Sequence, residues 1–185
     1  EVSWNCDTFA RLGVSHVALF NYRGYAGTAG APGERALVAD TRALLSQVQR
    51  RTGHDDARTV LMGRSIGSAV AVCASEGRPL AGLLLITPLA SVLRLARRGF
   101  PLLPVRLLLR HRFDALAVAR RSEASVEMIV AGADEVTPPE EAALLAAAWA
   151  GPCRSHTLPG IAHNNVHEHP DYLEAVTGAL RRLLP

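Results

Sequence analysis

Short apolar runs alternate with longer amphipathic stretches along most of the chain. Each run is brief and contiguous, as is typical of a buried strand, whereas the longer stretches repeat their apolar residues near the spacing of a helix. The runs predict strands at residues 15–20, 59–62, 80–87, 126–133 and 154–158. The amphipathic stretches predict helices at residues 34–51, 66–76, 138–149 and 172–184.

Strands that alternate with helices predict an α/β fold, with a mostly parallel sheet and helices on both of its faces. The run Leu83-Leu84-Leu85-Ile86 fits this architecture, because a strand covered on both faces is apolar at every position. The chain has 185 residues, of which 49% are hydrophobic. That size and composition predict a single globular domain over residues 1–185.

Two stretches fall outside the alternation. Residues 21–33 are rich in glycine and form a predicted loop. The segment from Pro88 to Ser125 is apolar, is interrupted by prolines and follows the end of a predicted strand. Ligand sites of parallel sheets lie beyond the carboxyl ends of the strands. We therefore expect this segment to form a minimal cap or one wall of a site.

Charge and cysteine content restrict the classes of binding partner and the cellular location that we expect. The net charge is +3, and the basic residues come as dispersed arginine pairs rather than as a patch with interleaved aromatic residues, which argues against nucleic acid. Cys6, Cys73 and Cys153 have neither metal-ligand spacing nor the even count of a disulfide framework, so a cytoplasmic location is expected. The longest apolar runs, such as residues 102–109, are too short to span a membrane.

The motif with the clearest chemistry is Gly63-Arg64-Ser65-Ile66-Gly67. A G-x-S-x-G pattern between a strand and a helix is typical of a sharp turn that exposes a serine nucleophile. The turn would place Ser65 at the N-terminus of the helix, where the backbone N–H of Ile66 can stabilise an oxyanion. The bare pattern also fits a turn whose serine merely caps a helix. The strand predicted before it and the helix predicted after it favour the nucleophile.

A serine nucleophile needs a base, and usually an acid that orients the base. In the fold that carries this turn, the expected chain order is the serine, then an aspartate or glutamate, then a histidine, each on a loop after a later strand. Asp134 follows the predicted strand at 126–133 and is the predicted acid, with Glu135 as its neighbouring competitor. His163 follows the last predicted strand and is the predicted base. The alternative interpretations are an acid near a helix N-terminus and an ordinary loop histidine.

His163, His167 and His169 form a small histidine-rich tract. Histidines four residues apart occur in zinc sites on helices. Here Pro170 follows directly, and no acidic or cysteine ligand stands at a matching spacing. We therefore predict no metal and no cofactor.

With these motifs identified, the chain resembles the α/β-hydrolase superfamily, and within it the serine-aminopeptidase-like branch of small hydrolase-domain proteins. The loop from Asn21 to Gly30 is similar to that branch's Asn-Tyr-Arg-Gly-Tyr-Gly-x-Ser-x-Gly loop. Arg112-Phe113-Asp114 is similar to its Arg-Phe-Asp turn, and Gly160 to Asn164 is similar to its Gly-x-x-His-Asn loop. The resemblance covers nearly the whole chain and implies a Ser-His-Asp triad on the α/β-hydrolase fold.

The resemblance also implies departures from the family's plan. Family members enter the domain through earlier strands and a His-Gly loop that donates the second oxyanion N–H, and Glu1 to Arg11 resembles the helix after that loop. We therefore expect a C-terminal portion of the domain that lacks the first strands and the oxyanion loop. Ala26 stands where the family usually has glycine, and alanine is tolerated there only if φ is negative.

The leading hypothesis is a serine hydrolase that cleaves an ester, thioester or amide through an acyl-enzyme. One alternative is a hydrolase fold without catalysis, which serves as a binding module or is inert. Another is an acyltransferase that uses the same triad. The expected partner is a small-molecule or acyl substrate, and the sequence predicts neither its identity nor the oligomeric state.

Overall fold

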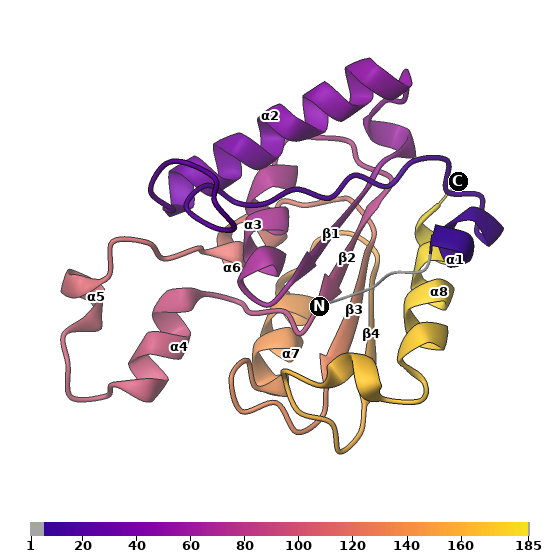
Figure 1. The fold of residues 1–185 in the computed structure, drawn as a ribbon. Helices are drawn as coiled ribbons and strands as arrows, with labels where there is room; N and C mark the ends of the chain where they lie inside the picture. The colour runs from indigo at the N-terminus through magenta and orange to yellow at the C-terminus, as the bar shows by residue number, and fades with distance from the viewer. Residues whose placement is uncertain (1–5, 185) are drawn as a thin grey trace.

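A parallel sheet forms the centre of the molecule, whose computed structural model describes residues 6–184 (Figure 1). The strands lie in the order β1-β2-β3-β4, and each is parallel to its neighbour. The predicted strands at 59–62, 80–87, 126–133 and 154–158 are confirmed to within a few residues. They are β1 (Val60–Arg64), β2 (Gly82–Ile86), β3 (Val126–Ala131) and β4 (Cys153–Leu158).

Helices connect the strands and cover both faces of the sheet (Figure 1). The four predicted helices are confirmed as α2, α3, α7 and α8. Short 3-10 turns, η1 (Asp56–Arg58) and η2 (Val166–Glu168), precede β1 and α8. The α-helices are α1 (Cys6–Arg11), α2 (Glu34–Thr52), α3 (Ile66–Ser75), α4 (Val92–Gly99), α5 (Val105–Leu108), α6 (Ala115–Ala119), α7 (Pro139–Ala148) and α8 (Tyr172–Leu183).

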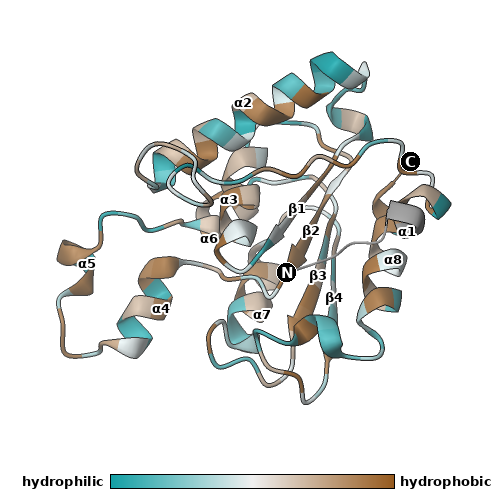
Figure 2. Cartoon of the chain, viewed as in Figure 1, coloured by the Kyte–Doolittle hydropathy of each residue, from teal (hydrophilic) through white to brown (hydrophobic). Residues whose placement is uncertain are grey.

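The core consists of two apolar layers, one on each face of the sheet. Successive residues of a strand point to opposite layers. Leu83 and Leu85 of β2 pack with α2, α3, α6 and α7, whereas Leu84 and Ile86 pack with α1 and α8. In Figure 2 the central strand β2 is coloured hydrophobic and β4 largely hydrophilic, and the helices around the sheet are of mixed hydropathy. Burial on both faces explains why a continuous apolar run, and not an alternating one, marks β2.

The predicted strand at residues 15–20 is wrong, because these residues adopt no regular structure. Together with Leu61 and Met62 of β1 they line a cavity of about 500 Å³. The cavity separates the segment from β1, so its backbone is not placed for the ladder of hydrogen bonds that defines a strand. Leu19 is 81% exposed, which shows that this apolar run faces solvent rather than a closed core.

The predicted loop at residues 21–33 is present, and it contains an unexpected backbone conformation. Ala26 has φ +48°, contrary to the expectation of a negative φ. The loop turns tightly at this point, since the N–H of Thr28 donates to the carbonyl oxygen of Tyr25 at 3.0 Å. The closure of this turn places an alanine in the left-handed region that glycine adopts freely.

Replacing Ala26 with glycine is expected to stabilise the fold. The left-handed conformation costs an alanine about 1 to 2 kcal/mol, and glycine offsets about 0.5 to 1 kcal/mol of this gain through the entropy of its unfolded state. The net effect predicts a Tm about 2 °C higher in differential scanning calorimetry. Ala29→Gly is the matched control, because Ala29 is exposed in the same loop but has no positive φ. If the Tm of Ala26→Gly is no higher than that of Ala29→Gly, the backbone at Ala26 is not strained.

The segment from Pro88 to Ser125 divides into two parts. Residues 113–119 lie in the core, where α6 packs against α3 and α7. Residues 92–112 carry α4 and α5 and extend away from the sheet as the projection at the left of Figure 1. We call this projection the α4–α5 hairpin (residues 92–112). Over the described part of the chain, no helix combines the length and the apolar character that crossing a membrane requires.

Candidate active site

The turn between β1 and α3 holds Ser65 in a strained conformation. Ser65 has φ +53° and ψ −126°, a combination that L-residues rarely adopt. Its N–H donates to the carbonyl oxygen of Ile86 at 2.9 Å, so the turn is fastened to β2. The strand and helix approach each other so closely that a Cβ on Gly63 would lie 2.3 Å from the carbonyl oxygen of Gly67. Glycine is therefore a steric requirement at position 63.

Gly63→Ala is expected to destabilise the protein strongly. The new Cβ would meet backbone atoms of Gly67 and Ser68 at 2.3 to 2.8 Å, and these atoms cannot move without shifting α3 away from β1. Overpacking of this kind costs about 2 to 3 kcal/mol, which lowers the Tm by roughly 4 to 10 °C. Gly99→Ala is the matched control, because no atom lies within 4 Å of the added Cβ there. Equal melting temperatures of the two variants would show that the close approach of β1 and α3 does not require glycine at position 63.

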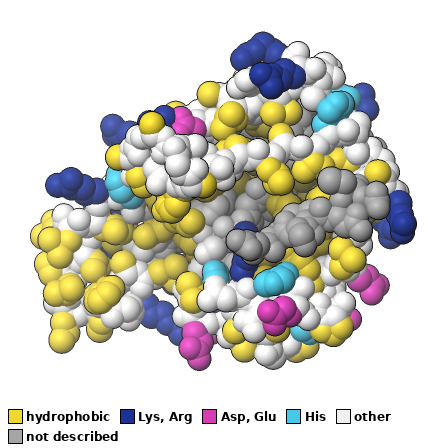
Figure 3. All heavy atoms as spheres, viewed as in Figure 1, with side chains coloured by type: hydrophobic (Ala, Val, Ile, Leu, Met, Phe, Trp, Pro, Cys, Tyr) yellow, Lys and Arg dark blue, Asp and Glu magenta, His cyan; other side chains and the backbone are white. Residues whose placement is uncertain are grey.

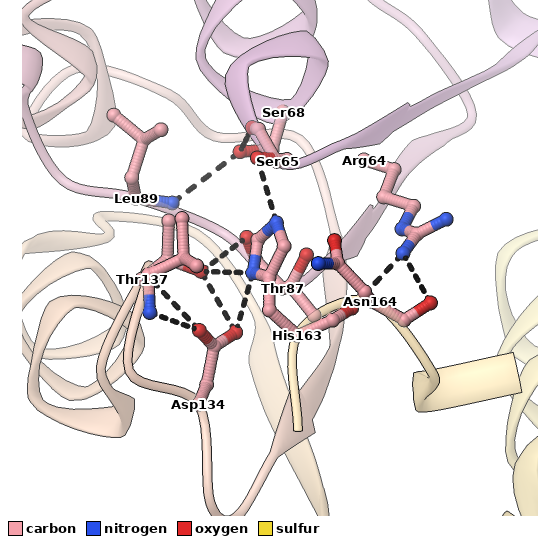
Figure 4. A network of polar contacts seen from close by, with 10 residues as sticks. Arg64, Ser65, Ser68, Thr87, Leu89, Asp134, Thr137, His163 and Asn164 are labelled. Atoms are coloured by element: carbon pink, nitrogen blue, oxygen red, sulfur yellow. Dashed lines mark hydrogen bonds and ion pairs between the residues drawn. The ribbon is translucent and has the colours of Figure 1, made fainter. Parts of the chain in front are cut away.

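Three side chains from three loops meet at the carboxyl edge of the sheet (Figure 4). His163 Nε2 lies 3.0 Å from Ser65 Oγ, and His163 Nδ1 lies 2.7 Å from Asp134 Oδ2. Asp134 and His163 are buried, whereas Ser65 is half-buried. The structure thus brings together the three side chains that the sequence singles out. Their arrangement allows a proton to pass from the serine hydroxyl to the imidazole.

Asp134 is held in place by the turn that precedes α7. Its Oδ1 accepts the N–H of Val136 at 2.9 Å and the N–H of Thr137 at 2.7 Å, which leaves Oδ2 directed at His163. Glu135, the competing acid, is exposed to solvent. Burial and contact with the imidazole therefore separate the two neighbouring acids, and Asp134 is the one that contacts His163.

Thr137 belongs to the site, although the sequence analysis did not single it out. Its hydroxyl oxygen lies 2.9 Å from Asp134 Oδ2 and 3.1 Å from both His163 Nδ1 and the carbonyl oxygen of Thr87 (Figure 4). With one proton, the hydroxyl donates either to the carboxylate or to the carbonyl. The available signal was its position three residues after Asp134, since aspartates at turns bond the backbone a few residues further on.

Thr87 is a second unpredicted residue of the site, and its backbone is also strained. It follows β2 directly and has φ +44°, which is an outlier for a branched side chain. Its N–H donates to the carbonyl oxygen of Ile129 at 2.8 Å. Its hydroxyl is buried and finds no hydrogen-bond partner among the described residues. Strain of this kind clusters at functional sites, where the surrounding structure enforces it.

Two neighbours of Ser65 tie the loops of the site together. Arg64 Nη2 donates to the carbonyl oxygens of His163 and Asn164 at 2.9 and 3.1 Å, which anchors the histidine loop to the end of β1. The hydroxyl of Ser68 donates to the carbonyl oxygen of Ser65 at 2.5 Å and accepts the N–H of Leu89 at 3.3 Å. The Arg64 bonds thus hold the serine turn to the histidine loop, and the Ser68 bonds hold it to the segment after β2.

Ile66, the predicted oxyanion residue, is the first residue of α3 and directly follows Ser65. The N–H groups in the first turn of a helix have no acceptor within the helix, and they carry the positive end of its dipole. The backbone of Ile66 therefore has the properties of an anion-binding group. Its side chain is 39% exposed and is not required for this property.

The histidine-rich tract and Cys73 are the other groups with candidate chemistry among the described residues. His167 lies in η2, and His169 Nδ1 lies 3.9 Å from Asp171 Oδ2, so the histidine-rich tract is spread along the chain. Among the side chains that the structure describes, those of residues 9–184, no group of three or more His, Cys, Asp or Glu is arranged to hold a metal ion. Burial raises the pKa of the Cys73 thiol to about 11, which disfavours the reactive thiolate.

Comparison with known proteins finds no matching family model. An uncharacterized protein of Mycobacterium tuberculosis is 37% identical over 175 residues, which are 94% of this chain and 60% of that protein. A Caenorhabditis elegans protein named as alpha/beta hydrolase domain-containing is 26% identical over 170 residues, 92% of this chain and 47% of that protein. The chain thus spans about half to three fifths of the length of these relatives.

Solved structures show the same architecture. The monoacylglycerol lipase of Paleococcus ferrophilus has a TM-score of 0.66 to this chain, at 19% identity, and the match covers 96% of this chain and 88% of that one. The sheet order, the strand-to-helix turn at Ser65 and the relative named for this domain agree with that likeness. The chain has the α/β-hydrolase fold, and in sequence it is similar to a protein named as alpha/beta hydrolase domain-containing.

Proposed function

We propose that the chain is a serine hydrolase that cleaves an ester, thioester or amide through an acyl-enzyme. The observation that carries the proposal is the continuous path from Ser65 Oγ through His163 to Asp134, with contacts of 3.0 and 2.7 Å. A serine hydroxyl becomes a nucleophile when a base takes its proton, and here the base lies within hydrogen-bond distance. The name of the similar Paleococcus protein, a monoacylglycerol lipase, supports an ester among the three substrate classes.

Acylation begins when His163 Nε2 takes the proton of Ser65 and Oγ attacks the carbonyl carbon of the substrate. The carbonyl oxygen becomes an oxyanion, and the bond to the leaving group breaks as His163 returns the proton to that group. Water then gives a proton to His163 and attacks the acyl carbon. The bond between that carbon and Ser65 Oγ breaks as His163 returns the proton to Oγ, which releases the acid and restores the serine. Asp134 accepts the Nδ1–H of His163, so Nε2 remains the accepting nitrogen.

The oxyanion is stabilised by the N–H of Ile66 and by the N-terminal end of α3. Because Ser65 and Ile66 are adjacent, the group that attacks and the group that stabilises the charge are placed by the same turn. Each oxyanion donor contributes on the order of a hundredfold to a thousandfold to the rate. The strained turn at Ser65 thus places both the nucleophile and the N–H group that stabilises the oxyanion.

A fluorophosphonate probe tests the nucleophile. The wild-type chain should be labelled on Ser65, as read by mass spectrometry of its peptides, and Ser65→Ala should not be labelled. His163→Ala should lower the labelling rate by at least about a thousandfold, because the hydroxyl then has no base. Ser155→Ala, which removes an exposed serine of β4, is the control and should react like the wild type.

Thermal melts of the same samples make each result decisive. A chain that unfolds cooperatively but takes no label would overturn the proposal and favour a binding module on the hydrolase fold. Labelling that survives in Ser65→Ala would place the nucleophile elsewhere. Product analysis with an added alcohol separates the remaining alternative, since an acyltransferase would form the new ester in preference to the free acid.

Thr137 is proposed as a positioning residue that acts through Asp134 and His163. Thr137→Val removes the hydroxyl that contacts both side chains and is expected to lower kcat for a p-nitrophenyl ester about tenfold with KM unchanged. Thr137→Ser keeps the hydroxyl and should retain kcat within about twofold. A Thr137→Ser variant as slow as Thr137→Val would show that the methyl group, and not the hydroxyl, is needed.

A further inference from the structure

The α4–α5 hairpin is fastened at its base and free at its tip. The N–H of Val92 donates to the carbonyl oxygen of Arg112 at 2.9 Å, which closes the base of the projection. The N–H of Arg112 also donates to Glu34 Oε2 at 2.8 Å, and the N–H of Ala90 donates to Glu141 Oε2 at 3.1 Å. The hairpin is therefore held to the body by α2 and α7, while residues between its ends extend outward (Figure 1).

The tip exposes an unusual amount of apolar surface. Single exposed apolar residues are ordinary, whereas a contiguous patch marks a contact surface. Hydrophobic side chains cover much of this projection, at the left of Figure 3. The exposed fractions are 58% for Phe100, 95% for Leu102, 52% for Leu103, 85% for Leu107 and 64% for Leu108.

The backbone of the tip is ordered by its own hydrogen bonds. The N–H of Leu103 donates to the carbonyl oxygen of Phe100 at 3.2 Å, and the N–H of Leu109 donates to that of Val105 at 2.8 Å. Val105 is buried and packs inward. The leucines around it are consequently presented outward by a defined backbone.

The hairpin is also strongly basic. Between Val92 and Phe113 the sequence contains no acidic residue. Arg94 and Arg98 form ion pairs with Glu141 and Glu140 of α7. The other arginines of the hairpin are exposed, and they are Arg97, Arg106, Arg110 and Arg112.

We propose that the α4–α5 hairpin docks on the surface of an anionic lipid bilayer. Leu102 and Leu107 enter the boundary between headgroups and acyl chains, and the exposed arginines contact the lipid phosphates. A bilayer complements this surface because it is apolar inside and anionic at its face. A second copy of the chain does not, since a shared hairpin interface would bring arginine against arginine.

The base of the hairpin lies near the candidate active site. The hairpin follows β2 at its carboxyl end, where the N–H of Leu89 donates to Ser68 Oγ, three residues from Ser65. The inference does not require catalysis, because vesicle binding is measured without turnover.

Flotation with vesicles tests the docking surface. The wild-type chain should bind phosphatidylcholine vesicles with about 30 mol % phosphatidylglycerol, and it should bind pure phosphatidylcholine far more weakly. Leu102→Ser combined with Leu107→Ser should lower the partition coefficient at least about tenfold. Leu19→Ser combined with Leu173→Ser removes two leucines that are 81% and 53% exposed elsewhere, and it should bind like the wild type.

Charge is tested with a second set of variants. Arg97→Gln, Arg106→Gln and Arg110→Gln together should lower binding to the anionic vesicles roughly a hundredfold, and about 0.5 M NaCl should weaken the wild type similarly. Arg50→Gln, Arg51→Gln and Arg181→Gln remove three exposed arginines from other helices, and their combination should have at most a small effect.

Three outcomes would overturn the proposal. The first is equal binding of neutral and anionic vesicles by the wild-type chain. The second is equal loss of binding in the hairpin variants and their controls. The third is absence of vesicle binding together with a lipid-free dimer in sedimentation that Leu102→Ser and Leu107→Ser dissociate, which would assign the patch to a second copy.

Discussion

The close approach of β1 and α3 is the constraint on which the site depends. Without a side chain at Gly63, the carbonyl of Gly67 comes within the distance that a Cβ would occupy, and the turn between them forces φ of Ser65 to +53°. Such a conformation costs about 1 to 3 kcal/mol and persists only when its surroundings enforce it. Nearly every residue of α3 is buried, so the packing of this helix supplies the enforcement. The packing of α3 in the core therefore determines the position of the serine hydroxyl.

A parallel sheet converts this local geometry into a site. The loops after β1, β2, β3 and β4 leave the sheet at the same edge, and they carry Ser65, Thr87, Asp134 and His163 respectively. These residues are distant in sequence, and the order of the strands alone brings their loops together. Arg64 then links the first loop to the last through the carbonyl oxygen of His163. The loops at this edge are thus held together by direct contacts with one another.

The sequence predicted local structure correctly where only one physical interpretation fitted the residues. The apolar run of β2 allowed only a strand buried on both faces, and the glycine spacing around Ser65 allowed few turns. It was uninformative where the outcome depended on distant partners. The apolar run at 15–20 predicted burial, but it could not show whether a neighbouring strand would pair with it. The φ of Ala26 likewise depended on the geometry of its turn. The position of Thr137 three residues after Asp134 indicated a turn, but its contacts with Thr87 and the imidazole depended on the assembled fold.

The single proton of Thr137 connects the strain at Thr87 to the proposed chemistry. Its hydroxyl reaches Asp134 Oδ2 at 2.9 Å and the carbonyl oxygen of Thr87 at 3.1 Å, so each acceptor competes for the same proton. A proton directed to the carboxylate reduces the negative charge that faces the imidazole, whereas one directed to the carbonyl leaves the carboxylate free to stabilise imidazolium. The strained residue Thr87 thus supplies the acceptor that competes with Asp134 for the proton of Thr137.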